Sequence, residues 1–487
     1  MLLSSCNDIS RVLIGYQFHF GVGIQRPTML LDCEDNVPCF LHSISKGCYR
    51  TSKNRIKPCN RTPDRTSEST DNDDIFLSSY QKTVDRRIRA IYRGIRDSMI
   101  IKLDDIPISN LRIDNKAIVS DNVSLTGIIS IQNLGICTIS LWLDNYKPQT
   151  ENEWRKICDS EVVSFTLTHT NLNRSNWTLM EFVRYLSALC HKTVNPHIIS
   201  LNGFEQNSCL RNKQDFADFL KSAYETSTTE SPISYEMDSY PLSFIQYNIE
   251  TDALNTIFPT QAKELRLFLN HDTHWNLKKE QLVQDMIENA EVSTRESIHW
   301  LVTLQGSIKL CSRDLGTTIE ESFNVMLLET DVVLTMKYFL SSIMQNLSRL
   351  SSEFSNPIKV SEMKDNIFTT MDNYFNINLS HNDQTMKRID KFKEIFRINT
   401  TYKSVSDRLE ILSVKISNEN SAIIEKQQVF LAIVFGLFGS LSVVYIFLQR
   451  ILENSIADHC IFISAFLISA VIAGIIYFVA KKMRLKK

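Results

Sequence analysis

The 487-residue chain predicts an α+β domain, followed by a long-helix bundle and a C-terminal two-helix transmembrane hairpin. Three observations support this fold class. Short β-like runs alternate with helical runs over residues 1–260, helical spacing dominates from about residue 261, and the chain ends in two long uncharged stretches. The length also exceeds the usual size of one domain, which favours two units besides the membrane element.

Residues 1–260 are expected to form a cytoplasmic α/β domain. The runs that predict strands are rich in β-branched and aromatic residues and cover 11–20, 98–103, 127–132, 136–143, 162–168 and 197–201. The runs 178–192 and 213–224 carry apolar residues at helical spacing. The segment 49–74 is first basic, then acidic, and too polar to bury, so we expect a disordered insertion there.

Residues 261–403 are expected to form a cytoplasmic helical domain. Two capping boxes, Ser293 with Glu296 and Thr318 with Glu321, predict helix starts, because hydroxyl and carboxylate reciprocally satisfy free backbone donors. After the second box, residues 319–350 have the apolar density of a helix that is packed on several sides.

One long stalk helix is expected over 404–448, since no proline or glycine interrupts 404–435. Its length would be about 68 Å at roughly 1.5 Å per residue. Steps of three and four residues predict a coiled-coil seam that consists of Leu409, Leu412, Ile416, Asn420, Ile423, Gln427 and Phe430.

Two membrane spans are predicted, Val429–Leu448 and Cys460–Ala480, because each is uncharged and long enough for a core about 30 Å thick. The external loop 449–459 holds one arginine, whereas the tail 481–487 is strongly basic. Positive charge stays on the cytoplasmic side, so both termini are expected in the cytoplasm. The predicted location is the inner or plasma membrane, as a multi-pass protein. The N-terminal residues show no secretory signal, which agrees with a cytoplasmic first domain.

The small residues of the first span have two interpretations. Gly436 and Gly439 suit close helix packing in lipid, and Asn420 on the seam is assigned to packing as well. The alternative is functional: Ser440 faces water in a pore that several subunits share.

This order of parts resembles the CorA-type divalent-cation transporters, which are homopentamers with long helices that line the pore. The Gly-Met-Asn motif of that family is absent, because residues 444–454 read VYIFLQRILEN. Alignment of the first spans places Gln449 at the filter position, Ser440 at a pore-facing hydroxyl and Leu437 at an apolar constriction. Gln427 and Val444 complete the predicted pore lining. Gln449 can equally be an interfacial polar cap on the helix.

The resemblance implies an oligomeric channel or transporter for divalent cations that the cytoplasmic domain gates. CorA-like proteins without the tripeptide also occur as membrane effectors in type III CRISPR defence, where a nucleotide-type second messenger acts on the cytoplasmic domain. The implied partners are membrane lipid, further copies of the chain and a small signalling ligand, with Mg²⁺ or a nucleotide as the bound group. The alternative is a membrane-anchored cytoplasmic interaction or scaffold protein without transport activity.

Several other functions lack support in the sequence. The formal net charge of −2 offers no basic face, so no direct nucleic-acid binding is expected. No phosphate-binding glycine loop or H-E-x-x-H motif occurs, and we expect no enzyme. His271 and His274 are interpreted as polar residues at the start of a helix, in preference to metal ligands. Zinc at Cys33, Cys39, Cys48 and Cys59 is the less favoured alternative to free thiols, because no C-x2-C pair is present.

Overall fold

The computed structural model describes part of the chain. The described residues are 8–22, 45–52, 55–58, 99–103, 105–118, 123–132, 135–167, 176–194, 237–258, 287–350, 365, 383–451, 463–469, 471 and 474. The chain divides into two compact units, Met1–Glu353 with Asp365–Asp407 and Phe354–Lys364 with Arg408–Lys487. The first unit contains the sheet, and the second contains most of the last long helix.

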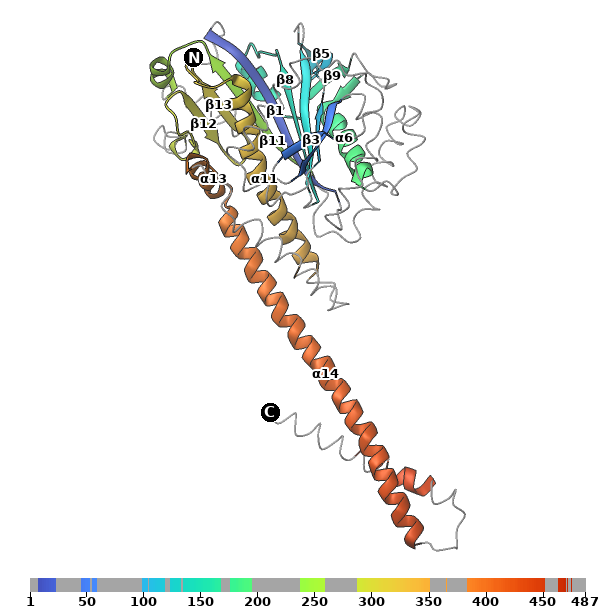
Figure 1. Cartoon of the computed structure of the whole chain (residues 1–487). Helices are drawn as coiled ribbons and strands as arrows, with labels where there is room; N and C mark the ends of the chain where they lie inside the picture. Colours follow the sequence, from blue (N-terminus) through green and yellow to red (C-terminus); the bar gives the residue numbers. More distant parts are fainter. Residues whose placement is uncertain are drawn as a thin grey trace. The chain divides into compact units, whose positions relative to one another are not determined.

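A mixed sheet forms the centre of the first unit, with the strand order β10-β9-β5-β7-β8-β1-β11-β13-β12 (Figure 1). Strand β4 pairs with β7 and β2, β3 pairs with β2, and β6 pairs with β5. Among the described pairings only β11 with β13 is parallel. The strands are β1 (Ile9–Gly21), β2 (Ser45–Ser52), β3 (Arg55–Pro58), β4 (Met99–Leu103), β5 (Ile106–Ile113), β6 (Lys116–Ala117), β7 (Ser124–Ile131), β8 (Ile136–Asp144), β9 (Val163–Leu167), β10 (Asn176–Thr178), β11 (Asp238–Tyr247), β12 (Ile298–Val302) and β13 (Ser307–Cys311).

The longest strand, β1, lies between β8 and β11. Its Ile14 is opposite Leu143 on one side and Ser243 on the other. Five predicted strands are confirmed as β1, β4, β7, β8 and β9. The sixth, 197–201, lies outside the described residues, as does the predicted helix 213–224. Strands β2 and β3 overlap the start of the predicted insertion 49–74, whose remaining residues are likewise not described.

One face of the sheet is apolar and packs against α5 (Glu151–Ile157) and α6 (Leu179–Val194). From β1 it receives Tyr16, Phe18 and Phe20, because alternate residues of a strand point to the same side. The Tyr16 hydroxyl donates to a backbone carbonyl of α5, at Ile157. Helix α6 confirms the prediction for 178–192, and its apolar side closes this core.

The other face carries polar side chains and is covered by α11 (Ile319–Leu350); α11 and α6 lie on opposite sides of the sheet (Figure 1). Gln17 donates to the Leu327 carbonyl at 2.8 Å, and His19 contacts Asp331 at 2.9 Å. The predicted start of α11 is confirmed, since the Thr318 hydroxyl accepts the Glu321 N–H at 3.1 Å.

The range 261–403, expected to be helical, contributes two strands to the same sheet. β12 and β13 are five-residue runs that pair with each other, and β13 extends the sheet from β11. The predicted helix start at Ser293 is wrong, because residues 291–297 are not helical and the Ser293 hydroxyl donates to Glu291. Ser293 and Glu296 have the spacing of a capping box, but the element that follows them is strand β12 and not a helix.

A buried ion pair joins α11 to α13 (Asp383–Ile395). Arg388 donates through two nitrogens to the two carboxylate oxygens of Glu329, at 2.7 and 2.6 Å. Arg388 also donates to the hydroxyls of Thr294 and Thr385. The Glu329 side chain is fully buried, so its charge depends on this partner.

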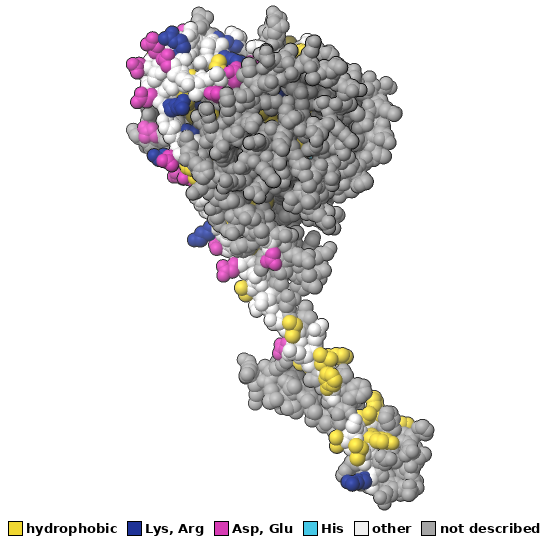
Figure 2. All heavy atoms as spheres, viewed as in Figure 1, with side chains coloured by type: hydrophobic (Ala, Val, Ile, Leu, Met, Phe, Trp, Pro, Cys, Tyr) yellow, Lys and Arg dark blue, Asp and Glu magenta, His cyan; other side chains and the backbone are white. Residues whose placement is uncertain are grey.

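Helix α14 (Ile398–Ile451) contains 54 residues and starts six residues before the predicted start at Ser404. Arg397, with a φ of 54°, separates it from α13. Large apolar side chains are exposed along its length, and Figure 2 shows them in yellow. They are Ile411, Val414, Ile424, Phe430, Leu431, Phe435, Val443 and Ile446.

The membrane part of the predicted fold is contradicted. In the described ranges, no helix is both long and apolar enough to cross a bilayer. The predicted first span, 429–448, lies within α14. The predicted second span, 460–480, is described only at 463–469, 471 and 474.

Four predictions are therefore wrong as they stand: the CorA-like fold with a transmembrane hairpin, the cation channel or transporter, the ion-transport class and the multi-pass membrane location. All four rest on the two spans. The membrane anchor in the alternative prediction meets the same objection. The structure supports an α+β unit built on a mixed sheet, together with a long helix.

Candidate functional site

The outer surface of strands β5, β9 and β10 is polar. Along β9, Ser164 and Thr166 alternate with buried residues, and on β10 Asn176 and Thr178 flank buried Trp177. Successive side chains of a strand point to opposite faces, so the apolar ones enter the core below α6. The hydroxyls and the amide are therefore left on the outside.

Strand β5 brings Arg112 to the same surface through an irregular stretch. Its pairing with β9 shifts register between Ser109 and Arg112, and Asn110 has a φ of 49°. A bulge of this kind bends a strand and redirects its side chains. Past Arg112, Asp114 and Asn115 have φ values of 53° and 63° and form the two-residue turn to β6. Such a turn needs positive φ at both positions, which Asp and Asn tolerate.

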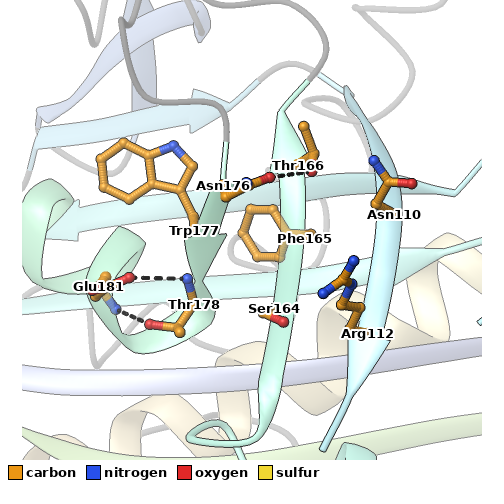
Figure 3. Close-up of a pocket in the computed structure, with 9 residues that line it drawn as sticks. All are labelled: Asn110, Arg112, Ser164, Phe165, Thr166, Asn176, Trp177, Thr178 and Glu181. Carbon is orange, nitrogen blue, oxygen red and sulfur yellow. Dashed lines mark hydrogen bonds between the residues drawn. The ribbon is translucent and has the colours of Figure 1, made fainter. Parts of the chain in front are cut away.

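These three strands and the start of α6 enclose a pocket of about 390 Å³ (Figure 3). Natural ligand pockets measure roughly 300–1,000 Å³, so a small metabolite fits the volume. The pocket is lined by Asn110, Arg112, Ser164, Phe165, Thr166, Asn176, Trp177, Thr178 and Glu181. Phe165 and Trp177 are almost fully buried, and their rings pack against Phe182 of α6.

The two charged groups of the pocket differ in their surroundings. Glu181 accepts the Thr178 N–H at 3.2 Å, and the Thr178 hydroxyl accepts the Glu181 N–H at 3.2 Å. This capping box fixes the carboxylate at the start of α6. Arg112 is exposed, and its guanidinium makes no hydrogen bond or ion pair with any other residue that the structure describes. Its guanidinium is thus available to a ligand.

The neutral groups of the pocket can both donate and accept. The Thr166 hydroxyl donates to the Asn176 side-chain oxygen at 2.7 Å, which fixes the two residues relative to each other. Ser164 and Asn110 lie nearer to Arg112 (Figure 3). The nine lining residues include no histidine, cysteine or lysine; they provide hydroxyl and amide groups, one guanidinium and one carboxylate.

His299 in β12 is held by several side chains. His299 contacts Glu291 at 2.7 Å and the Asn255 side-chain oxygen at 2.9 Å, and its ring stacks on Phe258. Burial tends to raise the pKa of Glu291, but hydrogen bonds from His299 and Ser293 outweigh burial and lower it. The serine donates to the carboxylate instead of to the imidazole, so no catalytic triad is formed.

The structure places all the predicted pore-lining and helix-packing residues on α14. Gln427 is exposed and Val444 is partly exposed. Of the other six residues, the structure describes only the helical backbone. These residues are Asn420, Gly436, Leu437, Gly439, Ser440 and Gln449. None of them lies in the pocket of the first unit.

Metal sites receive no support in the described part of the chain, where no cluster of three histidine, cysteine or acidic residues occurs. The predicted candidates Cys33, Cys39, Cys59, His271 and His274 lie outside the described residues, and Cys48 is described only as backbone of β2. The free-thiol prediction is confirmed for four buried cysteines, which are Cys137, Cys158, Cys190 and Cys311. Burial raises the pKa of the Cys158 thiol to about 12.

No protein-family model, curated protein or solved structure matches this chain. The pocket is therefore interpreted from its own geometry. The sequence does contain a signal for it, because hydroxyl and amide side chains alternate with apolar ones in 163–167 and 176–178. Nothing in the local pattern shows that Arg112 joins them.

Proposed function

We propose that the first unit is a binding domain for a small anionic, hydroxyl-bearing molecule, held in the pocket of β5, β9 and β10. The supporting observation is Arg112, an unpaired guanidinium at the edge of a concave surface of hydroxyl and amide groups. Guanidinium binds carboxylate and phosphate oxygens through two parallel hydrogen bonds. The nucleotide-type ligand that the sequence analysis expected carries phosphate groups and hydroxyls, so it belongs to the same chemical class.

The two charges give the ligand an orientation. Its anionic group would lie at Arg112, within reach of the Ser164 hydroxyl, and away from the fixed carboxylate of Glu181. Hydroxyl groups on the rest of the ligand would bind Thr166 and Asn176. The rings of Phe165 and Trp177 are buried against α6, so they offer no exposed face on which a base could stack.

The test is a titration calorimetry series with inorganic phosphate, glucose 6-phosphate, adenosine monophosphate, citrate and uncharged glucose. We expect the phosphorylated, hydroxyl-bearing compounds to bind more tightly than phosphate, and glucose not to bind. Arg112→Ala should weaken binding about 10- to 100-fold, because hydrogen bonds to charged groups contribute about 1.5–3 kcal/mol.

Arg313→Ala is the matched control, since this exposed arginine follows β13, which is next to the last strand at the other end of the strand order. It should leave the affinity unchanged. Equal affinities of Arg112→Ala and the unmodified protein, or no binding across the series, would refute the proposal.

A second candidate function is self-association through α14, which would present several binding domains together. Ile424, Leu431, Phe435 and Ile446 are each at least half exposed, and their steps of seven, four and eleven residues keep them on one side of the helix. Monomers rarely leave such a row in water. A second copy offers the same row, which suits a symmetric interface.

Light scattering coupled to size-exclusion chromatography tests self-association. We expect a mass that is a multiple of the 56.1 kDa chain. Ile424→Glu should shift the protein towards the monomer, whereas Ile411→Glu, on a different side of α14, should not. A monomeric unmodified chain, or the same response to both substitutions, would contradict self-association through this row.

A further inference from the structure

The polar face of the sheet arranges side-chain oxygens in two neighbouring rows. In one row, β1 places Gln17 opposite Ser140 of β8. In the next row, β8 places Thr138 opposite Ser130 of β7. Residues directly opposite each other on one face have Cβ atoms about 4.5–5.5 Å apart. Four oxygen-bearing side chains from three strands line one small space on this face.

Helix α11 covers this space with Leu327, Leu328 and Asp331, and a small cavity remains between helix and sheet. The space open to a water-sized sphere is about 10 Å³, which is enough for about one such particle. The cavity is separate from the pocket at Arg112, which lies over β5, β9 and β10.

Two fully buried oxygens at the cavity have no hydrogen-bond partner among the described residues. They are Gln17 Oε1 and Thr138 Oγ1. The Gln17 amide nitrogen already donates to the Leu327 carbonyl, so the remaining Gln17 atom can only accept. A buried acceptor without a partner is costly, which indicates that something else fills the space.

We propose that this cavity binds a monovalent cation of the size of Na⁺ or K⁺. Every polar side chain that lines it presents oxygen: one amide, three hydroxyls and the carboxylate of Asp331. Hard cations take oxygen ligands, and the single carboxylate among these five groups matches a single positive charge. Asp331 supplies the negative charge, and it is held in place by His19 at 2.9 Å.

The cation would connect β1, β7, β8 and α11, so its binding should stabilise the fold. Thermal unfolding is measured in NaCl, KCl and choline chloride at equal ionic strength. At concentrations well above the dissociation constant, we expect a midpoint roughly 3–8 °C higher in NaCl or KCl than in choline chloride. The rise should saturate with concentration, unlike a general salt effect.

Thr138→Val removes one ligand oxygen at nearly constant volume, so the difference between salts should disappear. Thr193→Val is the matched control, because this buried hydroxyl donates to the Leu189 carbonyl within α6, and the difference should persist. If Thr138→Val does not fold, Ser140→Ala serves in its place.

Equal midpoints in all three salts would overturn the proposal and leave a bound water as the occupant. Thallium(I), a heavy substitute for K⁺, gives a direct measurement on the unmodified protein. Its anomalous scattering should appear at the cavity in soaked crystals, and density without anomalous scattering would indicate water.

Discussion

The two faces of the central sheet are built on different chemistry. The side toward α6 presents Tyr16, Phe18 and Phe20 from β1, whereas the side toward α11 presents Gln17 and His19 from the same strand. Both faces are buried. One strand therefore serves an apolar interface and a hydrogen-bonded interface at alternate positions.

This difference indicates how each layer is specified. Apolar burial is non-directional, so the α6 side gains stability from area, at about 25 cal/mol per Å². Polar groups under α11 must meet particular partners, because an unpaired one is costly. The hydrogen bonds on the α11 side therefore fix the position of α11. The cavity that we propose as a cation site lies on the same side.

The largest expected effect comes from the buried ion pair of the α11 side. Arg388→Met leaves the fully buried Glu329 without a counter-charge, which should lower the free energy of unfolding by about 3–5 kcal/mol. Urea unfolding followed by circular dichroism measures the change. The double variant Arg388→Met/Glu329→Met should recover most of the loss.

Arg313→Met is the control for that experiment, since its side chain is 55% exposed and its pairing with Glu250 should contribute about 0–1 kcal/mol. A double variant as unstable as Arg388→Met alone would show that the methionine itself, and not the unpaired carboxylate, causes the loss.

On the apolar side, Leu141→Ala should cost about 2–5 kcal/mol, because it opens a cavity in a fully buried region. Thr138→Val, three residues away on the other face, should change the stability in choline chloride by much less, since its hydroxyl has no described partner. The same urea experiment compares them. Similar losses in both variants would remove the distinction between the faces.

Acid should weaken the apolar side through His191. Burial lowers the pKa of His191 from 6.5 to about 4. The unfolded chain therefore takes up a proton that the folded chain does not, and stability falls as the pH drops from 6.5 towards 4. The total loss is about 3 kcal/mol, and His191→Gln should remove this part of the pH dependence. Parallel stability curves for both proteins between pH 7.5 and 4.5 would contradict the assignment.

Strong local patterns in the sequence predicted much of the sheet. The β-branched run at 11–20 and the helical spacing at 178–192 correspond to β1 and α6. The two five-residue strands at 298–311 were missed, because short apolar runs inside a helix-rich stretch have no distinctive period. The hairpin prediction rested on the length and the lack of charge of two segments, and no helix in the described part of the chain is both long and apolar enough to cross a bilayer.

The candidate pocket could not be predicted because its parts are distant in the chain. Arg112 and Thr166 are brought together only by the pairing of β5 with β9, and a bulge sets the direction of Arg112. The cavity depends in the same way on Gln17 and Asp331, which are far apart in sequence. Alternation reveals which residues share a face, but not which strands are neighbours.

The central position of β1 has a consequence for synthesis. Strand β1 is synthesised before its partners β8 and β11, which end at Asp144 and Tyr247. At about 5–20 residues per second, both edges of β1 are complete only some 10–45 seconds later. During that time the unpaired edges of β1 can pair with strands of other chains, which is a route to aggregation.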